Sequence, residues 1–326
     1  MKLSRLSASL IAILGLSFSF ASSVHAQTEL KIGWTNTIDS HYGVAVTTFN
    51  DEIVKRTEGR YKLQYFPNGA LGGEREVLEG VQLGTQDMTI TSTGPVGNFV
   101  PETRIVDIPF LFRDYDHARK VLDGPIGQEI LDKFPAKGLV AISWMENGFR
   151  HVTNNKHPIK TPEDLAGLKI RTMENKVHMQ AFEALGALPT PMNMNEVFTA
   201  LQTGTVDGQE NPIPVILANK LYTVQKYLSL TGHVYSPALL IISPNIWNKM
   251  SDADKTAFKE AAKIALVANR KKVNDDEANG IAIIEKAGTE VNEVDKSLFQ
   301  KAVAPAYVDF NKEYGEANIK RIMEVK

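Results

Sequence analysis

The chain has 326 residues, enough for two domains of ordinary size. Its 43% hydrophobic and 23% charged content is ordinary for a soluble globular protein, and its formal net charge of −2 gives no case for a nucleic-acid partner. It contains no cysteine, which excludes disulfides, thiolate catalysis and thiolate metal sites.

The first 26 residues are predicted to be a signal peptide. Lys2 and Arg5 supply a positive start, an apolar stretch runs over residues 6–21, and Val24-His25-Ala26 fits the small-x-small cleavage pattern. The alternative is a membrane anchor, but the apolar stretch is short and broken by serines. We expect cleavage after Ala26 and a free periplasmic protein that is not inserted in the membrane, because a lipoprotein anchor needs a cysteine at the cleavage site.

The mature chain opens with a predicted strand, helix and strand. Apolar residues alternate in 30-LKIGW-34 and again in 61-YKLQYF-66. Between them, Asp39 or Ser40 can cap a helix that ends at Gly59. A strand, a helix and a strand at this spacing form a βαβ unit, which implies parallel pairing of the two strands.

Two segments far apart in the chain share one pattern. In 76-EVLEGVQLGTQDM-88 and 196-EVFTALQTGTVDG-208, a short amphipathic helix is followed by Gly84 or Gly204, and then by a turn into a strand. Glycine adopts the left-handed conformation that commonly ends a helix. The repeat indicates that one α/β plan is used twice, as two lobes.

The remaining helix signals are a short one and a long one. Thr161-Pro162-Glu163-Asp164 combines a cap, a proline at the first helical position and an acid at the third. Ser251 and Asp254 fit a capping box, and a helical pattern then continues to about Lys286. Such a helix is on the order of 50 Å long, so we expect it to lie across both lobes.

The chain carries few patterns typical of catalysis. There is no G-x-S-x-G, no G-x-x-x-x-G-K-[ST] and no H-E-x-x-H, and the histidines lack the spacing of metal ligands. Polar groups instead follow the predicted strands, where ligands bind in open α/β sheets. These groups are Thr35-Asn36, Thr91-Ser92-Thr93, Arg171 and Glu210-Asn211.

Two arginines at strand ends are candidate anchors for a carboxylate, because a planar guanidinium can bind one through two parallel hydrogen bonds. Arg171 ends the apolar strand of 167-GLKIRTMEN-175, and its alternative partner is Glu174 or another protein acid. Arg150 follows Asn147-Gly148-Phe149, and its alternative is a solvated arginine in a hairpin. Likewise, Asn211 could cap a helix, and Glu74 could start one.

Several stretches together resemble one family, the extracytoplasmic solute-binding proteins of tripartite ATP-independent periplasmic (TRAP) transporters, of the DctP-like type. The resemblance covers nearly the whole mature chain and is most specific from Gly167 to Pro212. The stretches are 72-GGEREVLEGVQLGTQDM-88, 105-IVDIPFLFRDYDHA-118, 148-GFRHVTN-154, 167-GLKIRTMEN-175 and 195-NEVFTALQTGTVDGQENP-212.

The resemblance implies an α/β, periplasmic-binding-protein-like fold, with two lobes joined by hinge strands and a long C-terminal helix that spans both. On this basis, lobe I is expected to contain residues 27–147 and about 236–275. Lobe II is expected to contain residues 148–235 and about 276–326.

The resemblance also implies roles for individual residues. Arg171 is expected to form the main salt bridge to the ligand carboxylate, with Arg150 as a second contact and Asn211 adding a hydrogen bond. Four more positions match family positions that contact the ligand in some members: His41, Glu74, Asn147 and Tyr235.

The expected function is therefore capture of a small organic acid and its delivery to TRAP membrane permease subunits, by a monomer that is not an enzyme and uses no cofactor. A hydroxy or sugar acid, such as an aldonate or uronate, fits a carboxylate at Glu74, whereas a second cation at Arg150 favours a C4-dicarboxylate. The alternatives are a binding protein of an ATP-driven importer and a periplasmic hydrolase or lyase.

Overall fold

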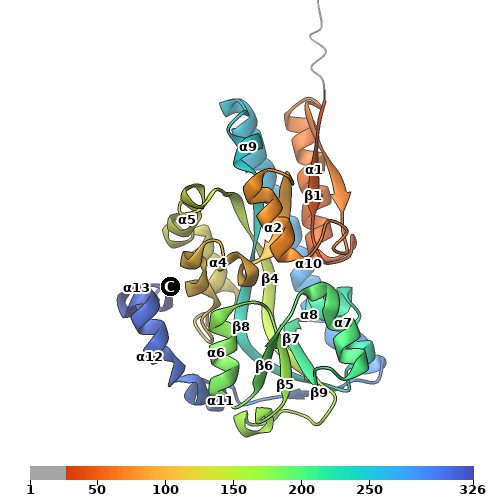
Figure 1. The fold of residues 1–326 in the computed structure, drawn as a ribbon, viewed down its shortest axis with the longest axis vertical. Coiled ribbons are helices and arrows are strands. Elements are labelled where there is room, and N and C mark those ends of the chain that lie inside the picture. Colours follow the sequence, from red (N-terminus) through yellow and green to blue (C-terminus); the bar gives the residue numbers. More distant parts are fainter. Residues whose placement is uncertain (1–26) are drawn as a thin grey trace, which may run out of the picture.

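The computed structural model describes residues 27–326 (Figure 1). The predicted signal peptide and its cleavage site lie outside these residues. The described chain is an α/β structure built on one sheet of nine strands. The strands are β1 (Thr28–Gly33), β2 (Tyr61–Phe66), β3 (Met88–Ser92), β4 (Val140–Asn154), β5 (Lys169–Thr172), β6 (Leu188–Pro191), β7 (Gly208–Pro212), β8 (Tyr227–Ile242) and β9 (Glu290–Glu293).

Helices pack against both faces of this sheet. The α-helices are α1 (His41–Arg56), α2 (Glu74–Leu83), α3 (Thr93–Val96), α4 (Tyr115–Asp123), α5 (Pro125–Leu131), α6 (Lys176–Ala184), α7 (Met194–Thr203), α8 (Ile213–Ala218), α9 (Pro244–Trp247), α10 (Asp252–Lys286), α11 (Lys296–Val303), α12 (Ala306–Phe310) and α13 (Glu316–Met323). Short 3-10 segments include η1 (Pro101–Asp107) and η3 (Pro162–Leu165), and a π-helical turn, η5, spans Asn311–Gly315.

The strands lie in the order β2-β1-β3-β8-β4-β7-β5-β6. The strands on either side of the central pair, β8 and β4, belong to two lobes. We call the part around β1, β2 and β3 lobe I, and the part around β5, β6 and β7 lobe II. The end of β8 pairs with β3, and its beginning pairs with β9, so β8 and its partner β4 run through both lobes (Figure 1). The parallel pairing of β1 with β2 agrees with the predicted βαβ unit, and the predicted two-lobed α/β fold is confirmed.

The long helix α10 has 35 residues and begins where the sequence indicated, with the Ser251 side chain accepting from the Asp254 N–H. It packs on α1 in lobe I and on α8 in lobe II. Phe258 is buried in the core of lobe I, whereas Ile284 is buried in that of lobe II. The helix therefore spans both lobes. Within residues 27–326, no helix combines the length and the apolar character needed to cross a membrane.

The repeated pattern forms the same local structure in both lobes. Helices α2 and α7 end at Gly84 and Gly204, whose φ angles of 78° and 73° lie in the left-handed region. Each helix then leads into a strand, β3 or β7. The signal at Thr161–Asp164 does form a capping box, but it starts only the short 3-10 segment η3, because the chain must turn at once into β5.

The C-terminal segment differs from its expected assignment to lobe II. Helix α11 packs there, with Phe299 in a core cluster of that lobe. Helices α12 and α13, however, return to lobe I, where Phe310 and Ile319 pack in one cluster with Phe134. Their amphipathic pattern does not specify which apolar surface they cover, so the sequence left this return undetected.

The long strands β4 and β8 form the hinge between the lobes. They carry a bulge at Gly148, where their pairing shifts register. The φ of Gly148 is 123°, and a Cβ atom there would lie 3.0 Å from the Tyr115 hydroxyl oxygen. That hydroxyl accepts from the Phe149 N–H (3.2 Å) and donates to Oε1 of Glu277 on α10 (3.0 Å). The bulge is thus tied to both lobe I and the long helix.

Replacement of Glu277 by glutamine is expected to stabilise the protein at high pH. Burial raises the pKa of Glu277 from 4.5 to about 7, although its hydrogen bond with Tyr115 acts in the other direction. Because the folded-state pKa is the higher one, the wild-type carboxyl costs stability progressively as the pH rises from about 4.5 to about 7. The glutamine side chain can still accept from Tyr115.

In thermal unfolding at pH 8, the melting temperature of E277Q should be roughly 1–3 °C higher than that of wild type. Near pH 4.5 the two melting temperatures should be equal. Glu285→Gln, at an exposed position of the same helix, serves as the control and should show no such pH-dependent difference. Equal melting of E277Q and wild type at pH 8 would contradict the argument.

Candidate ligand-binding site

A narrow cavity lies between the lobes, where the polar ends of several strands meet. About 270 Å³ of space that no atoms fill lies here, including solvent space at the mouth of the cavity. Its lining residues come from the segment after β1, from α1, α2 and β3 of lobe I, from the hinge, and from β5, β7, α7 and α8 of lobe II. They are Thr35, Asn36, Tyr42, Glu74, Ser92, Asn147, Arg171, Met173, Met194, Asn211 and Val215.

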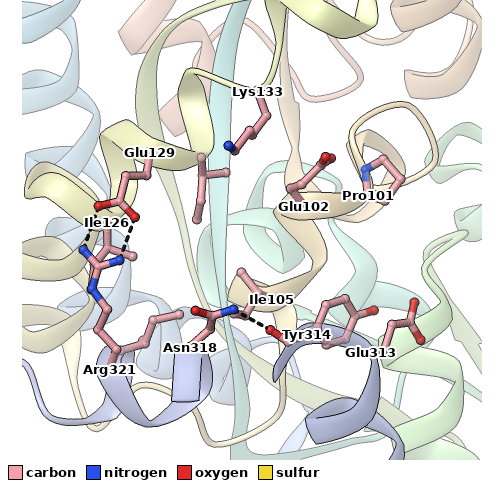
Figure 2. Close-up of a pocket in the computed structure, with 12 residues that line it drawn as sticks. Pro101, Glu102, Ile105, Ile126, Glu129, Lys133, Glu313, Tyr314, Asn318 and Arg321 are labelled. Carbon is pink, nitrogen blue, oxygen red and sulfur yellow. Dashed lines mark hydrogen bonds and ion pairs between the residues drawn. The ribbon is translucent and has the colours of Figure 1, made fainter. Parts of the chain in front are cut away.

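A larger hollow of about 1170 Å³ lies on the surface of lobe I, between η1, α5 and α13 (Figure 2). Its rim includes Arg321 and Glu129, which form an exposed ion pair at 2.6 Å. None of the seven predicted site residues lines it. The narrow cavity, which contains four of the seven, is therefore the candidate site.

Arg171 is the main cation of this cavity, and it is only 1% exposed. Its Nε and Nη2 donate to the Met192 carbonyl at 3.0 and 2.6 Å, whereas its buried Nη1 has no hydrogen-bond partner among the described residues. Burial lowers the pKa of Arg171 to about 10, so the guanidinium is still charged at neutral pH. One side of the fork is thus held by the backbone and the other is unused.

Glu174, the alternative partner of Arg171, is paired with another arginine. Glu174 accepts from Nη1 of Arg75 at 3.3 Å, on the rim of the interlobe boundary. No carboxylate of residues 27–326 lies within 4.0 Å of the Arg171 guanidinium. An internal ion pair therefore does not account for this buried charge.

Tyr42 brings a second unused polar group to the cavity. Its side chain is 1% exposed and its hydroxyl has no hydrogen-bond partner among the described residues. Burial raises the pKa of Tyr42 well above its usual value, so the hydroxyl stays protonated and can donate. A buried polar group without a partner costs about 1–3 kcal/mol, which makes both Tyr42 and Arg171 candidate ligand contacts.

Arg150, the predicted second ligand contact, lies outside the lining of the cavity. It is fully buried, does not line the cavity, and pairs with the carboxylate of Glu210 through Nε and Nη2. Nη2 also donates to Oδ1 of Asn211 at 3.0 Å. Arg150 is therefore neither a solvated hairpin residue nor part of the cavity lining, and its charge is matched by the protein.

Glu210 receives a further contact from Nε2 of His233 at 3.1 Å. Burial alone would raise the pKa of Glu210, but Arg150 and His233 more than offset this and hold the pKa well below its usual range. Glu210 is thus ionised, as the pairing with Arg150 requires. The arrangement also holds Asn211, whose Oδ1 accepts from Arg150 and whose Nδ2 donates to Gln209 Oε1 at 2.6 Å.

Glu74 and the end of β3 form the acceptor side of the cavity. The Glu74 carboxylate accepts from the Thr91 hydroxyl at 2.9 Å and from the Ser92 N–H at 3.4 Å. Burial raises its pKa, while the hydrogen bond of Thr91 and the charge of Arg171 act in the other direction. A carboxylate in this position can accept hydrogen bonds from ligand hydroxyl groups.

His41 and Asn147 act as a pair. The Nε2 atom of His41 lies 2.8 Å from Asn147 Oδ1, and burial lowers the pKa of His41 to about 4, so the imidazole is neutral at pH 7. We assign the Nε2 proton to this hydrogen bond, which leaves the Asn147 amide N–H groups for the cavity. His41 does not line the cavity, and it orients Asn147 from behind.

Tyr235 is not brought to the cavity. Its side chain packs edge-on against Phe112 and Phe149, and its hydroxyl donates to Glu146 Oε2 at 3.0 Å. Tyr235 belongs to the same lobe I core cluster as Leu239 and Ile241 of β8, so a ligand contact at Tyr235 has no support in this geometry.

Several lining residues were outside the predicted set. Thr35, Asn36 and Ser92 follow strands, so their signal was present in the sequence. Tyr42, Met173, Met194 and Val215 lie near helix starts and carried no such signal. Among the described residues, no group of three or more acidic, histidine or cysteine side chains is placed to hold a metal ion.

The chain is similar to known solute-binding proteins, both in sequence and in structure. The family described as bacterial extracellular solute-binding protein, family 7 (DctP), matches residues 33–313. The 2,3-diketo-L-gulonate-binding periplasmic protein YiaO of Escherichia coli is 40% identical over 293 residues, with 89% of each chain covered.

Two solved structures of TRAP periplasmic solute-binding proteins are also similar. That from Polaromonas sp. JS666, bound to D-erythronate, is 64% identical, with a TM-score of 0.91 over 92% of this chain and 99% of that one. That from Bordetella bronchispeptica, with density assigned to pantoate, is 53% identical, with a TM-score of 0.91 over 92% of this chain and all of that one.

Proposed function

This chain belongs to the bacterial extracellular solute-binding proteins of family 7, the DctP family, and on that basis we propose that it captures a short hydroxylated monocarboxylate. D-erythronate, the ligand of the relative from Polaromonas, is the leading candidate. The observation that carries this proposal is the pair of unused, buried hydrogen-bond donors in one cavity, Nη1 of Arg171 and the hydroxyl of Tyr42.

The ligand carboxylate docks on Arg171. A guanidinium and a carboxylate attract each other more strongly when water is excluded, and closing the lobes excludes it. The ligand hydroxyl groups then face Glu74 as acceptor and the amides of Asn147 and Asn211 as donors, all of which line the cavity. Binding and hinge closure are thereby coupled.

The charges around the cavity favour a monocarboxylate over a dicarboxylate. A second cation at Arg150 would suit a C4-dicarboxylate, but Glu210 neutralises that arginine. A second ligand carboxylate would also meet Glu74, which repels it unless one of the two is protonated. The ligands named for three relatives, D-erythronate, pantoate and 2,3-diketo-L-gulonate, are all monocarboxylates with hydroxyl groups.

Delivery follows from the family. The members are solute-binding proteins of transport, so the chain is not an enzyme, and the importer driven by ATP is not favoured by the match to the DctP family. We propose export to the periplasm with cleavage after Ala26, action as a monomer, and docking of the closed form on the permease subunits of a TRAP transporter.

A ligand panel tests the proposal. In calorimetry, D-erythronate should bind tightly and succinate should bind at least about 100-fold more weakly. At equal concentration, D-erythronate should raise the melting temperature more than succinate does. D-erythronate should also be recovered unchanged after long incubation and denaturation. Succinate that binds more tightly than D-erythronate would overturn the ligand class, and turnover of the bound acid would overturn the role as a binding protein.

A further inference from the structure

The segment directly after Arg171 is held by the opposite lobe. Residues Met173, Glu174 and Asn175 connect β5 to α6 in lobe II, yet each has a polar contact with lobe I. The Ser92 hydroxyl contacts Met173 Sδ at 3.3 Å, Arg75 contacts Glu174 Oε2 at 3.3 Å, Asn98 Nδ2 donates to the Glu174 carbonyl at 2.8 Å, and Asn175 Nδ2 donates to Asp107 Oδ2 at 2.7 Å.

These contacts differ in their surroundings. The Arg75–Glu174 ion pair has side-chain exposures of 56% and 38%, and exposed pairs of this kind contribute little. Asp107 and Asn175 are both completely buried. Leaving a buried polar group without its partner costs about 1–3 kcal/mol, so the contact between Asp107 and Asn175 dominates the set.

The Asp107 carboxylate is satisfied by one partner from each lobe. Oδ1 accepts from the Thr93 hydroxyl of lobe I at 2.6 Å, and Oδ2 accepts from Asn175 of lobe II. When the lobes separate, Asp107 keeps Thr93 and loses Asn175. Opening therefore leaves a buried carboxylate oxygen to be satisfied by water.

The Asn175 amide is likewise used completely. Its Oδ1 caps α6 by accepting from the N–H groups of Val177 and His178 at 2.9 and 3.1 Å, which fixes the orientation of Nδ2 toward Asp107. Val177 packs in the core cluster of lobe I. The start of α6 is thus joined to lobe I by a buried hydrogen bond and an apolar contact.

We propose that Asp107 and Asn175 form a latch between the lobes, which holds the closed form and so slows release of the ligand from Arg171. Asn175 lies four residues beyond Arg171, and neither it nor Asp107 lines the cavity, so both are positioning residues rather than ligand contacts. The inference rests on the proposed function, because release is measured on the ligand proposed above. It also assigns a role to Asp107 of 105-IVDIPFLF-112, which the binding site does not use.

An exchange of the two side chains gives the sharpest test. The measurements are made at pH 8, because burial raises the pKa of Asp107 to about 7. Asn175→Asp keeps the oxygen that caps α6 but loses the amide donor and faces Asp107 with a second carboxylate. Asp107→Asn keeps the bond from Thr93 but presents an amide to Asn175. In the double variant D107N/N175D, the new Asn donates to the new Asp, so the contact is restored in reverse. Asp295→Asn, at the exposed cap of α11, is the matched control for a charge change at a helix cap.

Release of isotope-labelled D-erythronate is the first readout. N175D should release the ligand about 10-fold faster or more, with an association rate within about twofold of wild type, whereas the double variant and the control should stay within about threefold of wild type. An unchanged release rate in N175D would overturn the latch while leaving the proposed function intact. A double variant as fast as N175D, with normal melting, would also overturn it.

Interlobe distance is the second readout. Because the chain has no cysteine, spin labels attached at Lys55→Cys on α1 and Thr199→Cys on α7 report one distance. N175D should shift the distance distribution to longer values with and without ligand, and the double variant should shift it back. If wild type does not bind D-erythronate, the ligand proposal fails, and these distances still decide the latch: an unchanged distribution in N175D overturns it.

Discussion

Arg171→Ala should severely weaken the binding of D-erythronate. Removal of one partner from a buried, hydrogen-bonded charge pair costs about 2–5 kcal/mol, which corresponds to a loss of roughly 30- to 5000-fold in affinity. The carboxylate also loses the only cation among the residues that line the cavity. Isothermal titration calorimetry measures the loss directly.

The same substitution should leave the fold intact and raise its stability slightly. Burial lowers the pKa of Arg171, so the folded state disfavours its charge, and Nη1 has no partner among residues 27–326. If the variant melts at or above the wild-type temperature but binds D-erythronate with the expected loss in affinity, Arg171 serves ligand binding at some cost in stability.

Arg171→Lys should bind weakly, because an ammonium group cannot form the two parallel bonds of the guanidinium fork. Arg75→Ala, at the exposed rim of the same interlobe boundary, is the control and should change the equilibrium affinity less than about fivefold. Near-wild-type affinity in Arg171→Ala would exclude the anchor role.

Arg150→Met should unfold much more easily than wild type. The substitution preserves much of the apolar volume but leaves Glu210 without its arginine in the interior, with His233 at 3.1 Å and His178 at 4.0 Å from its carboxylate. Breaking a buried ion pair from one side costs about 3–5 kcal/mol, which lowers the melting temperature by roughly 10 °C in a protein of this size. Thermal and urea unfolding report the loss.

A double variant separates the pair from a direct ligand contact. Arg150→Met/Glu210→Gln removes both charges and should regain more than half of the lost stability. Arg321→Met breaks the exposed pair with Glu129 and serves as the control. It should lower the free energy of unfolding by less than about 1 kcal/mol. If Arg150→Met lost affinity but kept its melting temperature, Arg150 would be a ligand contact and the pairing with Glu210 would be secondary.

The sequence correctly predicted the features that depend only on neighbouring residues. The cap at Ser251 and the left-handed glycines Gly84 and Gly204 act within a few residues of their own positions, so their outcome hardly depends on the rest of the chain. The segment 161–164 shows the limit of such signals. Its capping box forms, yet the helix stops after one turn because β5 must pair with β6 and β7.

By itself the sequence determined two α/β lobes, a helix long enough to span them, and an arginine, Arg171, at a strand end that faces a cleft. These follow from periodicity, caps and strand ends, which are properties of short stretches. Only the tertiary structure decided that Arg150 is neutralised by Glu210, 60 positions away, and that α12 and α13 return to lobe I. The reason is that the partner of a buried charge, or of an apolar helix face, is selected by long-range packing of the strands, which no local pattern records.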